Sequence, residues 1–259
     1  YHGTRMSPSR RWVAVADNVG LNAPIHVIDG NDLTTTQIPH GGQWLEAMWL
    51  RKSDRLAAVT FDQPLLFGVK GNARILIWKM ASVAKAKYAT DATGTWAAPE
   101  VDLALPDALP GAITTLSWIA VSPDDARLAV PFHRPIKPVG APEDATPASL
   151  RPDLAIVDVD KQIVKTVADI AGPVSFTADG STLVGFRRKD TVTDGTTTTT
   201  RELVLLHLPS MVQEILPSPL PGGLSFFVSH KGNWIVMTTT SGGAGYVLHD
   251  LATGKTTQM

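Results

Sequence analysis

The residues that could carry hydrolytic chemistry are few and lie far apart in the sequence. Asp17, Asn18, Asp62 and His133 offer the oxygen and nitrogen ligands that a metal-dependent lactonase needs, provided that they converge on one ion. The seven histidines show no paired spacing such as His-Glu-x-x-His, which would place two ligands on one helix face. The sequence therefore predicts no metal site and no cofactor, and lactonase-like chemistry remains an alternative.

Two other hydrolytic mechanisms find little support in the sequence. Glycoside hydrolysis needs a pair of carboxylates close together, and Glu46 is the only acid in the five short runs expected around a central pocket. No Gly-x-Ser-x-Gly sequence marks a nucleophilic serine, and there is no cysteine. We therefore expect no catalytic residue.

Two histidines are expected to have a structural role. His207 and His249 follow apolar runs at the place where Asp29 and Asp158 stand in other parts of the sequence. Short polar side chains at the end of a strand commonly bond the turn that follows. The sequence predicts that both imidazoles bond to a turn.

The composition is that of a folded globular protein. Of the 259 residues, 44% are hydrophobic and 18% are charged, and the formal net charge is −1. Near neutrality leaves no field that would recruit nucleic acid, and no apolar run approaches the ~20 residues of a membrane-spanning helix. The sequence begins at Tyr1 without a visible signal peptide. We interpret it as a mature or excised segment of a larger bacterial protein. Scarce lysine and frequent Ala, Thr and Pro indicate a periplasmic or extracellular location.

A turn followed by an apolar strand recurs five times. The copies are SPSRRWVAV from Ser7, RKSDRLAAV from Arg51, SPDDARLAV from Ser122, TADGSTLVG from Thr177 and SHKGNWIVM from Ser229. Ser or Thr in the first position can bond the nearby backbone, and Pro, Asp or Gly favours the bend. One short run precedes each copy and two more follow it, so the repeating unit has four strands.

Four-stranded units at this spacing are typical of a β-propeller, an all-β fold whose blades stack around an axis. A β-sandwich also has many short strands, but it does not require the same order of turn and strand five times. We therefore predict one domain over residues 1–259 with five four-stranded antiparallel blades, which form a complete ring or part of a larger propeller. The expected blades are residues 1–40, 41–91, 112–170, 171–217 and 222–259, and the fourth strand of the second blade is expected at AKAKYA, residues 84–89. The expected second strands are Trp12–Ala16, Leu56–Phe61, Arg127–Phe132, Thr182–Phe186 and Trp234–Thr239.

Alternation along each second strand should place one set of apolar residues between blades. The residues that share these positions are Val13, Val15, Ala57, Val59, Leu128, Val130, Leu183, Ile235 and Met237. Trp12 and Trp234 occupy one common position of the repeat, and both are expected in the core between blades.

The third copy resembles the bacterial YVTN and TolB-like propeller repeats, through SPDDARLAV and the following LAIVDVDKQIVKTV, from Ser122 to Val167. Those repeats share a Ser-Pro-Asp-Gly turn before an apolar strand and an Ile-x-Val-x-Asp strand after it. WD-repeat features are weaker, since only IWK at Ile77–Lys79 is similar to the Trp-Asp end. The resemblance covers nearly the whole chain and implies blades rather than chemistry, because such propellers serve as binding platforms, protease-associated domains and enzymes.

The long insertions are predicted to share one face of the propeller. Asp62–Asn72, His133–Pro152 and Arg187–Arg201 fall between second and third strands, and Asp91–Gly111 connects two blades. Loops presented by a rigid scaffold often carry function. The candidate binding face combines strand-end residues with one loop tryptophan: Asn18, Asp62, Trp96, His133, Arg134 and Arg188.

These features predict a non-catalytic scaffold that binds a partner protein through the 91–111, 133–152 and 187–201 loops, with Trp96 as the anchor. The alternative is a lactonase- or hydrolase-like propeller enzyme with a small-molecule or metal pocket on the same face. Carboxylates that converge in a polar funnel would favour the enzyme, and a plugged or apolar axis would favour the scaffold.

Overall fold

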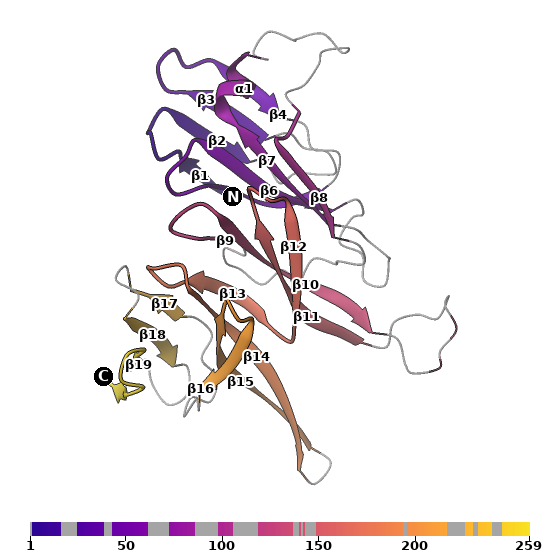
Figure 1. Cartoon of the computed structure of the whole chain (residues 1–259), viewed down its shortest axis with the longest axis vertical. Coiled ribbons are helices and arrows are strands. Elements are labelled where there is room, and N and C mark those ends of the chain that lie inside the picture. The colour runs from indigo at the N-terminus through magenta and orange to yellow at the C-terminus, as the bar shows by residue number, and fades with distance from the viewer. Residues whose placement is uncertain are drawn as a thin grey trace. The chain divides into compact units, whose positions relative to one another are not determined.

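The part of the chain that the structure describes is almost entirely β-structure. The computed structural model describes residues 2–16, 25–38, 43–61, 73–85, 98–105, 119–136, 140, 142, 149–193, 196–216, 226–229, 233–239 and 245–259. These residues form twenty strands and one short helix, and the strands make five four-stranded sheets. In every sheet the strands are paired in chain order, so each sheet is a meander (Figure 1). The five sheets match the five predicted blades.

The strand bounds agree closely with the repeat. The first sheet contains β1 (His2–Met6), β2 (Trp12–Ala16), β3 (Ile25–Asp29) and β4 (Thr35–Ile38), and the second contains β5 (Gln43–Trp49), β6 (Arg55–Phe61), β7 (Ala73–Lys79) and β8 (Val101–Leu105). The third contains β9 (Ala120–Val121), β10 (Arg127–Ile136), β11 (Ser149–Asp158) and β12 (Ile163–Ala168). The fourth contains β13 (Ala171–Phe176), β14 (Thr182–Thr193), β15 (Thr196–His207) and β16 (Val212–Leu216), and the fifth contains β17 (Phe226–Val228), β18 (Trp234–Thr239), β19 (Gly245–Asp250) and β20 (Thr256–Gln258). Each second strand begins within one residue of its predicted start.

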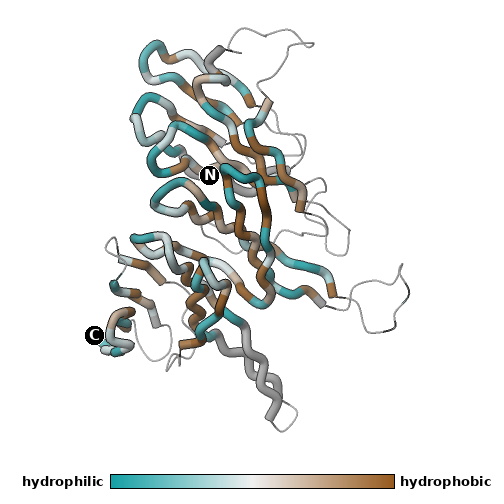
Figure 2. Tube along the Cα trace, viewed as in Figure 1, coloured by the Kyte–Doolittle hydropathy of each residue, from teal (hydrophilic) through white to brown (hydrophobic). Residues whose placement is uncertain are grey.

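Residue contacts divide the chain into two compact units. One comprises Tyr1–Thr114, Phe132–Arg151 and Asp158–Val164, and the other comprises Thr115–Pro131, Pro152–Val157 and Lys165–Met259. In both units, apolar residues concentrate in the strands and hydrophilic residues in the turns (Figure 2). The first unit buries a core between the first and second sheets. The second unit buries one core between the third and fourth sheets and another between the fourth and fifth.

In the four copies whose first residue is Ser or Thr, the side chain of that residue closes the turn. The Ser122 hydroxyl accepts the Arg127 N–H at 2.9 Å, and the Thr177 hydroxyl accepts the Thr182 N–H at 3.1 Å. The bond therefore spans five residues rather than reaching only the nearest backbone. The fourth residue of the turn has positive φ, 64° at Asp125 and 71° at Gly180, a conformation that glycine adopts without steric cost.

Backbone hydrogen bonds place the second copy of the turn one residue earlier than the sequence suggested. The first residue donates its N–H to the carbonyl five residues on, as from Ser122 to Arg127 at 2.9 Å, and here the bond runs from Leu50 to Arg55 at 3.0 Å. Position 1 of the repeat is therefore Ser7, Leu50, Ser122, Thr177 and Ser229. Because side chains alternate along a strand, this shift moves Ala57 and Val59 to the opposite face from the one predicted.

Neighbouring sheets pack by one rule. Positions are counted from the first residue of the turn, so positions 6 to 9 lie on the second strand. Residues at positions 6 and 8 of one sheet share a core with residues at positions 7 and 9 of the next sheet along the chain. In the first unit, Trp12 and Ala14 meet Leu56 and Ala58, and in the second unit the same rule joins Val184 to Ile235 and Met237. Most of the predicted core is buried: Ala57, Val59, Leu128, Val130, Leu183, Ile235 and Met237.

The first and fifth sheets depart from the predicted core. Val13 and Val15, at positions 7 and 9 of the first sheet, are only half-buried. Trp12 is 5% exposed as predicted, but Trp234, at the same position of the fifth sheet, is 39% exposed. The prediction for Trp234 was wrong because no later sheet covers that face within the described residues.

The second sheet takes its fourth strand from further along the chain than predicted. Residues Met80–Lys85 form helix α1 (MASVAK), whose Met80 and Val83 are buried in the core of the first unit. The fourth strand is β8, which pairs with β7 through Val101↔Ile77 and Leu103↔Ile75. The expected blade boundary at residue 91 was therefore wrong, because Ala, Met and Lys favour a helix while VDLAL alternates as a strand does.

The predicted Arg187–Arg201 loop is a β-ribbon. β14 and β15 pair without interruption from Thr182↔His207 to Thr193↔Thr196, and the ribbon extends beyond the rest of the fourth sheet (Figure 1). Its threonine-rich sequence suits strands, because β-branched residues pack well on a pleated surface. Similarly, β10 continues through His133 to Ile136, so the 133–152 insertion begins and ends as strand.

Candidate functional site

Of the six residues predicted for the binding face, the structure describes His133, Arg134 and Arg188. For Arg188 only the position in its strand is described. His133 and Arg134 lie on β10 and are half-buried, and the Arg134 guanidinium stands 5.5 Å from the centroid of the Phe132 ring. Arg188 lies on β14 opposite Arg201. Asn18, Asp62 and Trp96 lie outside the described residues. The predicted convergence of these six residues is therefore untested.

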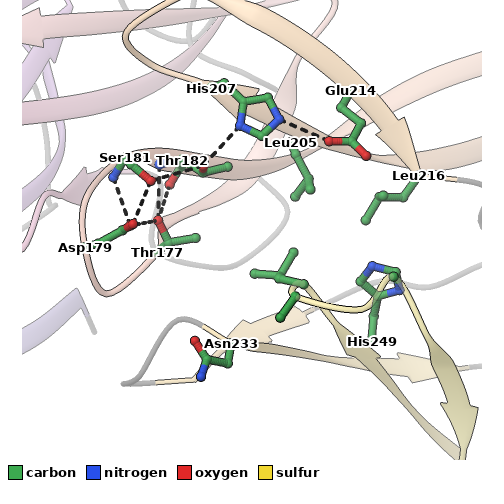
Figure 3. Close-up of a pocket in the computed structure, with 13 residues that line it drawn as sticks. Thr177, Asp179, Ser181, Thr182, Leu205, His207, Glu214, Leu216, Asn233 and His249 are labelled. Atoms are coloured by element: carbon green, nitrogen blue, oxygen red, sulfur yellow. Dashed lines mark hydrogen bonds and ion pairs between the residues drawn. The ribbon is translucent and has the colours of Figure 1, made fainter.

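A different site, which sequence reasoning missed, lies in the second unit between the fourth and fifth sheets. It is a cleft of about 410 Å³, and Figure 3 shows its side chains facing one another from the two sheets. The residues that line it are Thr177, Asp179, Ser181, Thr182, Leu205, His207, Glu214, Leu216, Asn233, His249, Leu251, Ala252 and Gly254. The cleft lies where the turns following β13, β17 and β19 approach the outer strands of the two sheets.

One end of the cleft is built by the Thr177–Ser181 turn of the fourth sheet. The Asp179 carboxylate accepts the Thr177 hydroxyl at 2.6 Å, the Ser181 N–H at 3.0 Å and the Ser181 hydroxyl at 2.8 Å. The Thr177 hydroxyl bond, followed by the bonds from Ser181, holds the pKa of Asp179 below its usual value. Asp179 is therefore a fixed negative charge whose lone pairs are largely occupied by its own turn.

The wall formed by the fourth sheet carries a hydroxyl, an imidazole and a carboxylate in line. The Thr182 hydroxyl lies 3.3 Å from His207 Nδ1, and His207 Nε2 lies 3.1 Å from the Glu214 carboxylate. This order is the one found in catalytic triads. Thr182 is 9% exposed and lines the cleft. Its hydroxyl and the Glu214 carboxylate together fix the orientation of the His207 ring.

The opposite wall carries a buried histidine. His249 is 6% exposed, and its Nδ1 lies 2.9 Å from the Thr256 hydroxyl on β20. Burial lowers the pKa of His249, and this outweighs the opposing charges of Asp250 and Glu214. The imidazole is therefore neutral at neutral pH. Figure 3 shows it across the cleft from His207 and Glu214.

The sequence assigned both histidines to turns, and the structure gives them different roles. His207 pairs with Thr182 in the register, and Asp250, not His249, is the equivalent residue in the fifth sheet, opposite Trp234. His249 therefore lies one residue earlier and points to the other face of its sheet. No local signal marks this, because only packing of the two sheets brings His249 and His207 to one cleft. Within the described part of the chain, no group of three or more histidines and acids is placed to hold a metal ion.

Acid should remove the contribution of Asp179 to stability. A carboxylate whose folded pKa is lowered stabilises the fold above its ordinary pKa of about 4, and that contribution is lost as the pH falls through the lowered folded pKa. In urea unfolding between about pH 2 and pH 5, Asp179→Asn should lose less stability with falling pH than the unchanged protein. Asp124→Asn, at the equivalent turn position, should behave alike, since Ser122 donates its hydroxyl to Asp124 and lowers its pKa. Parallel pH profiles for all three proteins would contradict this account.

Similarity to known proteins is confined to solved structures. No protein-family model and no curated protein matches the sequence. The chain is similar to dipeptidyl peptidase 4 from Porphyromonas gingivalis, with 13% identity and a TM-score of 0.59, over 98% of this chain and 38% of that one. It is also similar to the β-propeller domain of the Trilobed protease from Pyrococcus furiosus, with 12% identity and a TM-score of 0.58, over 99% of this chain and 68% of that one. TolB from Acinetobacter baumannii matches with 12% identity and a TM-score of 0.49, over 95% of this chain and 51% of that one.

These similarities identify the fold. The two alignments with the higher TM-scores cover nearly the whole chain, and one of the two structures is a β-propeller domain. Together with the five meander sheets, they show a β-propeller with five four-stranded blades. The chain spans about half the length of the TolB structure and 38% of the peptidase.

Proposed function

We propose that this β-propeller is a non-catalytic scaffold that binds a partner protein. The observation that supports it is an uncovered apolar face on the fifth sheet, composed of Phe227, Trp234, Val236, Tyr246 and Leu248. Phe227, Tyr246 and Trp234 are 66%, 53% and 39% exposed. Large exposed aromatic side chains gathered on one surface mark sites of protein contact, and Trp and Tyr dominate the energy of such contacts.

The register shows that these residues share one surface. Phe227 pairs with Val236, Val236 pairs with Leu248, and Tyr246 pairs with Thr238, two residues from Val236. Residues that are opposite or two apart on neighbouring strands lie on the same side of a sheet. The uncovered face of the fifth sheet therefore carries these apolar side chains across β17, β18 and β19, together with Thr238 opposite Tyr246 and Asp250 opposite Trp234.

The chemistry of the face favours an apolar sheet as its partner. In the second unit, positions 6 and 8 of the fourth sheet are covered by positions 7 and 9 of the fifth. Trp234 and Val236 are positions 6 and 8 of the fifth sheet, so this face continues an established interface. We propose that the partner is a separate protein that presents an aliphatic face of a β-sheet, because flat apolar sheet surfaces pack on one another.

Photo-crosslinking from Tyr246 tests this proposal. With p-benzoylphenylalanine in place of Tyr246, we expect an adduct to another protein that maps to an apolar strand, and we expect Trp234→Glu to abolish it because a charge would be buried. Ile163, which is 49% exposed on β12, is the matched control site and should give no adduct. The absence of an adduct, an adduct to a second copy of the chain, or an adduct that survives Trp234→Glu would each overturn the proposal.

The insertions remain part of the proposed partner surface. We infer that the 91–111, 133–152 and 187–201 segments, with Asn18, Asp62, Trp96, His133, Arg134 and Arg188, contribute contacts, supported by the tendency of insertions on rigid scaffolds to carry function. A crosslinker at Arg134 tests this in the same experiment, since an adduct to a different protein would contradict it. We also propose a periplasmic or extracellular location, supported by composition. No helix among the described residues has the length and apolarity to cross a membrane.

A further inference from the structure

We propose that the cleft between the fourth and fifth sheets binds an organic cation with an apolar stem, that is, an ammonium or guanidinium group on a short aliphatic chain. The proposal is independent of the uncovered face of the fifth sheet. It rests on three features of the cleft: the sign of its charges, an unmatched acceptor on its buried wall, and apolar side chains beside both.

The charged side chains that line the cleft are of one sign. Glu214 and Asp179 contribute carboxylates, and the lining residues that the structure describes include no lysine or arginine. Asp179 is held by three hydrogen bonds from its own turn, whereas the side chain of Glu214 is 54% exposed and bonds His207. Glu214 is therefore the carboxylate that remains able to accept from a ligand. An anion would meet repulsion without a compensating cation.

The second feature is the free nitrogen of His249. This side chain is more than nine-tenths buried and lines the cleft, and its Nδ1 is bonded to Thr256. Its Nε2 has no hydrogen-bond partner within the described structure. If Nδ1 carries the proton and donates it to the Thr256 hydroxyl, Nε2 is an acceptor. The neutral state of the ring, which burial favours, keeps that lone pair available. We assign this tautomer to His249 as part of the proposal.

The two acceptors come from opposite walls. Glu214 lies on β16 of the fourth sheet and His249 on β19 of the fifth, and Figure 3 shows them on either side of the cleft. A ligand group with several N–H donors and a positive charge can satisfy both at once, as an ammonium or guanidinium does. A neutral apolar molecule would cover both acceptors without offering them a donor, which costs binding free energy.

The third feature, the leucine side chains in the cleft, favours a ligand whose cationic group is attached to an aliphatic chain. Leu205, Leu216 and Leu251 also line the cleft, and Figure 3 shows Leu205 and Leu216 beside His207 and Glu214. A volume of about 410 Å³ lies at the small end of the range of roughly 300–1,000 Å³ typical of ligand sites. A short aliphatic chain with a cationic head fits this combination of size and lining, in the way that the side chains of lysine and arginine do.

Binding of n-butylguanidinium tests the proposal directly. We expect saturable, one-to-one binding with a dissociation constant of about 1 mM, as suits a ligand of this size, measured by calorimetry and by NMR shifts of the Leu205 and Leu216 methyl groups. n-Butanol has the same stem without the charge, and butyrate has the opposite charge. Both should bind at least about tenfold more weakly. Equal binding of n-butanol, or no saturation by about 20 mM n-butylguanidinium, would overturn the proposal.

Two substitutions locate the site. Glu214→Gln and His249→Gln should each weaken n-butylguanidinium at least about tenfold. Asp160→Asn is the matched control, since Asp160 is a highly exposed acid outside the cleft, and it should leave binding unchanged. Because His249 is buried and its replacement can disturb the fold, the nitrogen-15 shifts of His249 in the unaltered protein give a second readout. They should show a protonated Nδ1 and an Nε2 that shifts on binding, and a protonated Nε2 would overturn the assignment.

Discussion

Replacing Trp12 by alanine is expected to lower the free energy of unfolding by about 3–5 kcal/mol, the usual cost of removing a buried tryptophan. Trp12 is 5% exposed and shares a core with Trp49 and Trp78 of the second sheet. The Arg11 guanidinium lies over its ring, 4.5 Å from the centroid. The loss should appear in urea unfolding followed by far-ultraviolet circular dichroism, and in faster amide exchange across β2 and β3.

The fifth sheet supplies the matched control. Trp234 occupies the same position of the repeat, but it is 39% exposed on the uncovered face of its sheet. Trp234→Ala removes the same atoms and should cost clearly less than Trp12→Ala, because part of its side chain already meets water. Its effect should fall on the Tyr246 crosslink instead. Equal losses of stability for the two substitutions would mean that the two positions are equally buried and that the uncovered face does not exist.

Introducing a methyl group at Gly185 is expected to destabilise the protein by about 1–3 kcal/mol, although alanine reduces the entropy of the unfolded chain. A Cβ at Gly185 would stand 2.8 Å from Ile170 Cγ2 and 3.3 Å from Val174 Cγ1. Ile170 is 1% exposed and belongs to the core between the third and fourth sheets. Neither neighbour can withdraw without moving other buried side chains.

A double-mutant cycle identifies the cause. In a protein that already carries Ile170→Ala, the closest atom is gone, so the further change Gly185→Ala should cost less than about 0.5 kcal/mol. Urea unfolding of the four proteins gives the coupling free energy. If Gly185→Ala costs the same in both backgrounds, the effect comes from the strand itself and not from contact with Ile170.

Local patterns were sufficient for the strands and for the repeat. In four of the five copies the second strand begins where a Ser or Thr hydroxyl closes the turn on the backbone five residues later, as at Ser122 and Thr177. This signal is contained in a few neighbouring residues. The same kind of reasoning failed for the fourth strand of the second sheet, expected at residues 84–89. Residues 84 and 85 end helix α1, whose Met80 and Val83 are buried in the core, and residues 86–89 lie outside the described residues. The threonine-rich ribbon was also missed, since its composition was interpreted as a loop.

The sequence by itself determined five four-stranded units, the starts of their second strands and seven of the nine residues predicted to be buried on those strands. Burial could not reveal that the repeat in the second sheet starts one residue earlier than predicted, because Ala57 and Leu56, on opposite faces of the strand, are both buried. Only the bond from Leu50 to Arg55 fixes that register. Tertiary structure alone decided that Trp12 is covered and Trp234 exposed, since a tryptophan at the same position of the repeat gives no information about whether another sheet packs on it. It also decided the cleft, because His207 and His249 belong to different sheets and face each other only when those sheets pack.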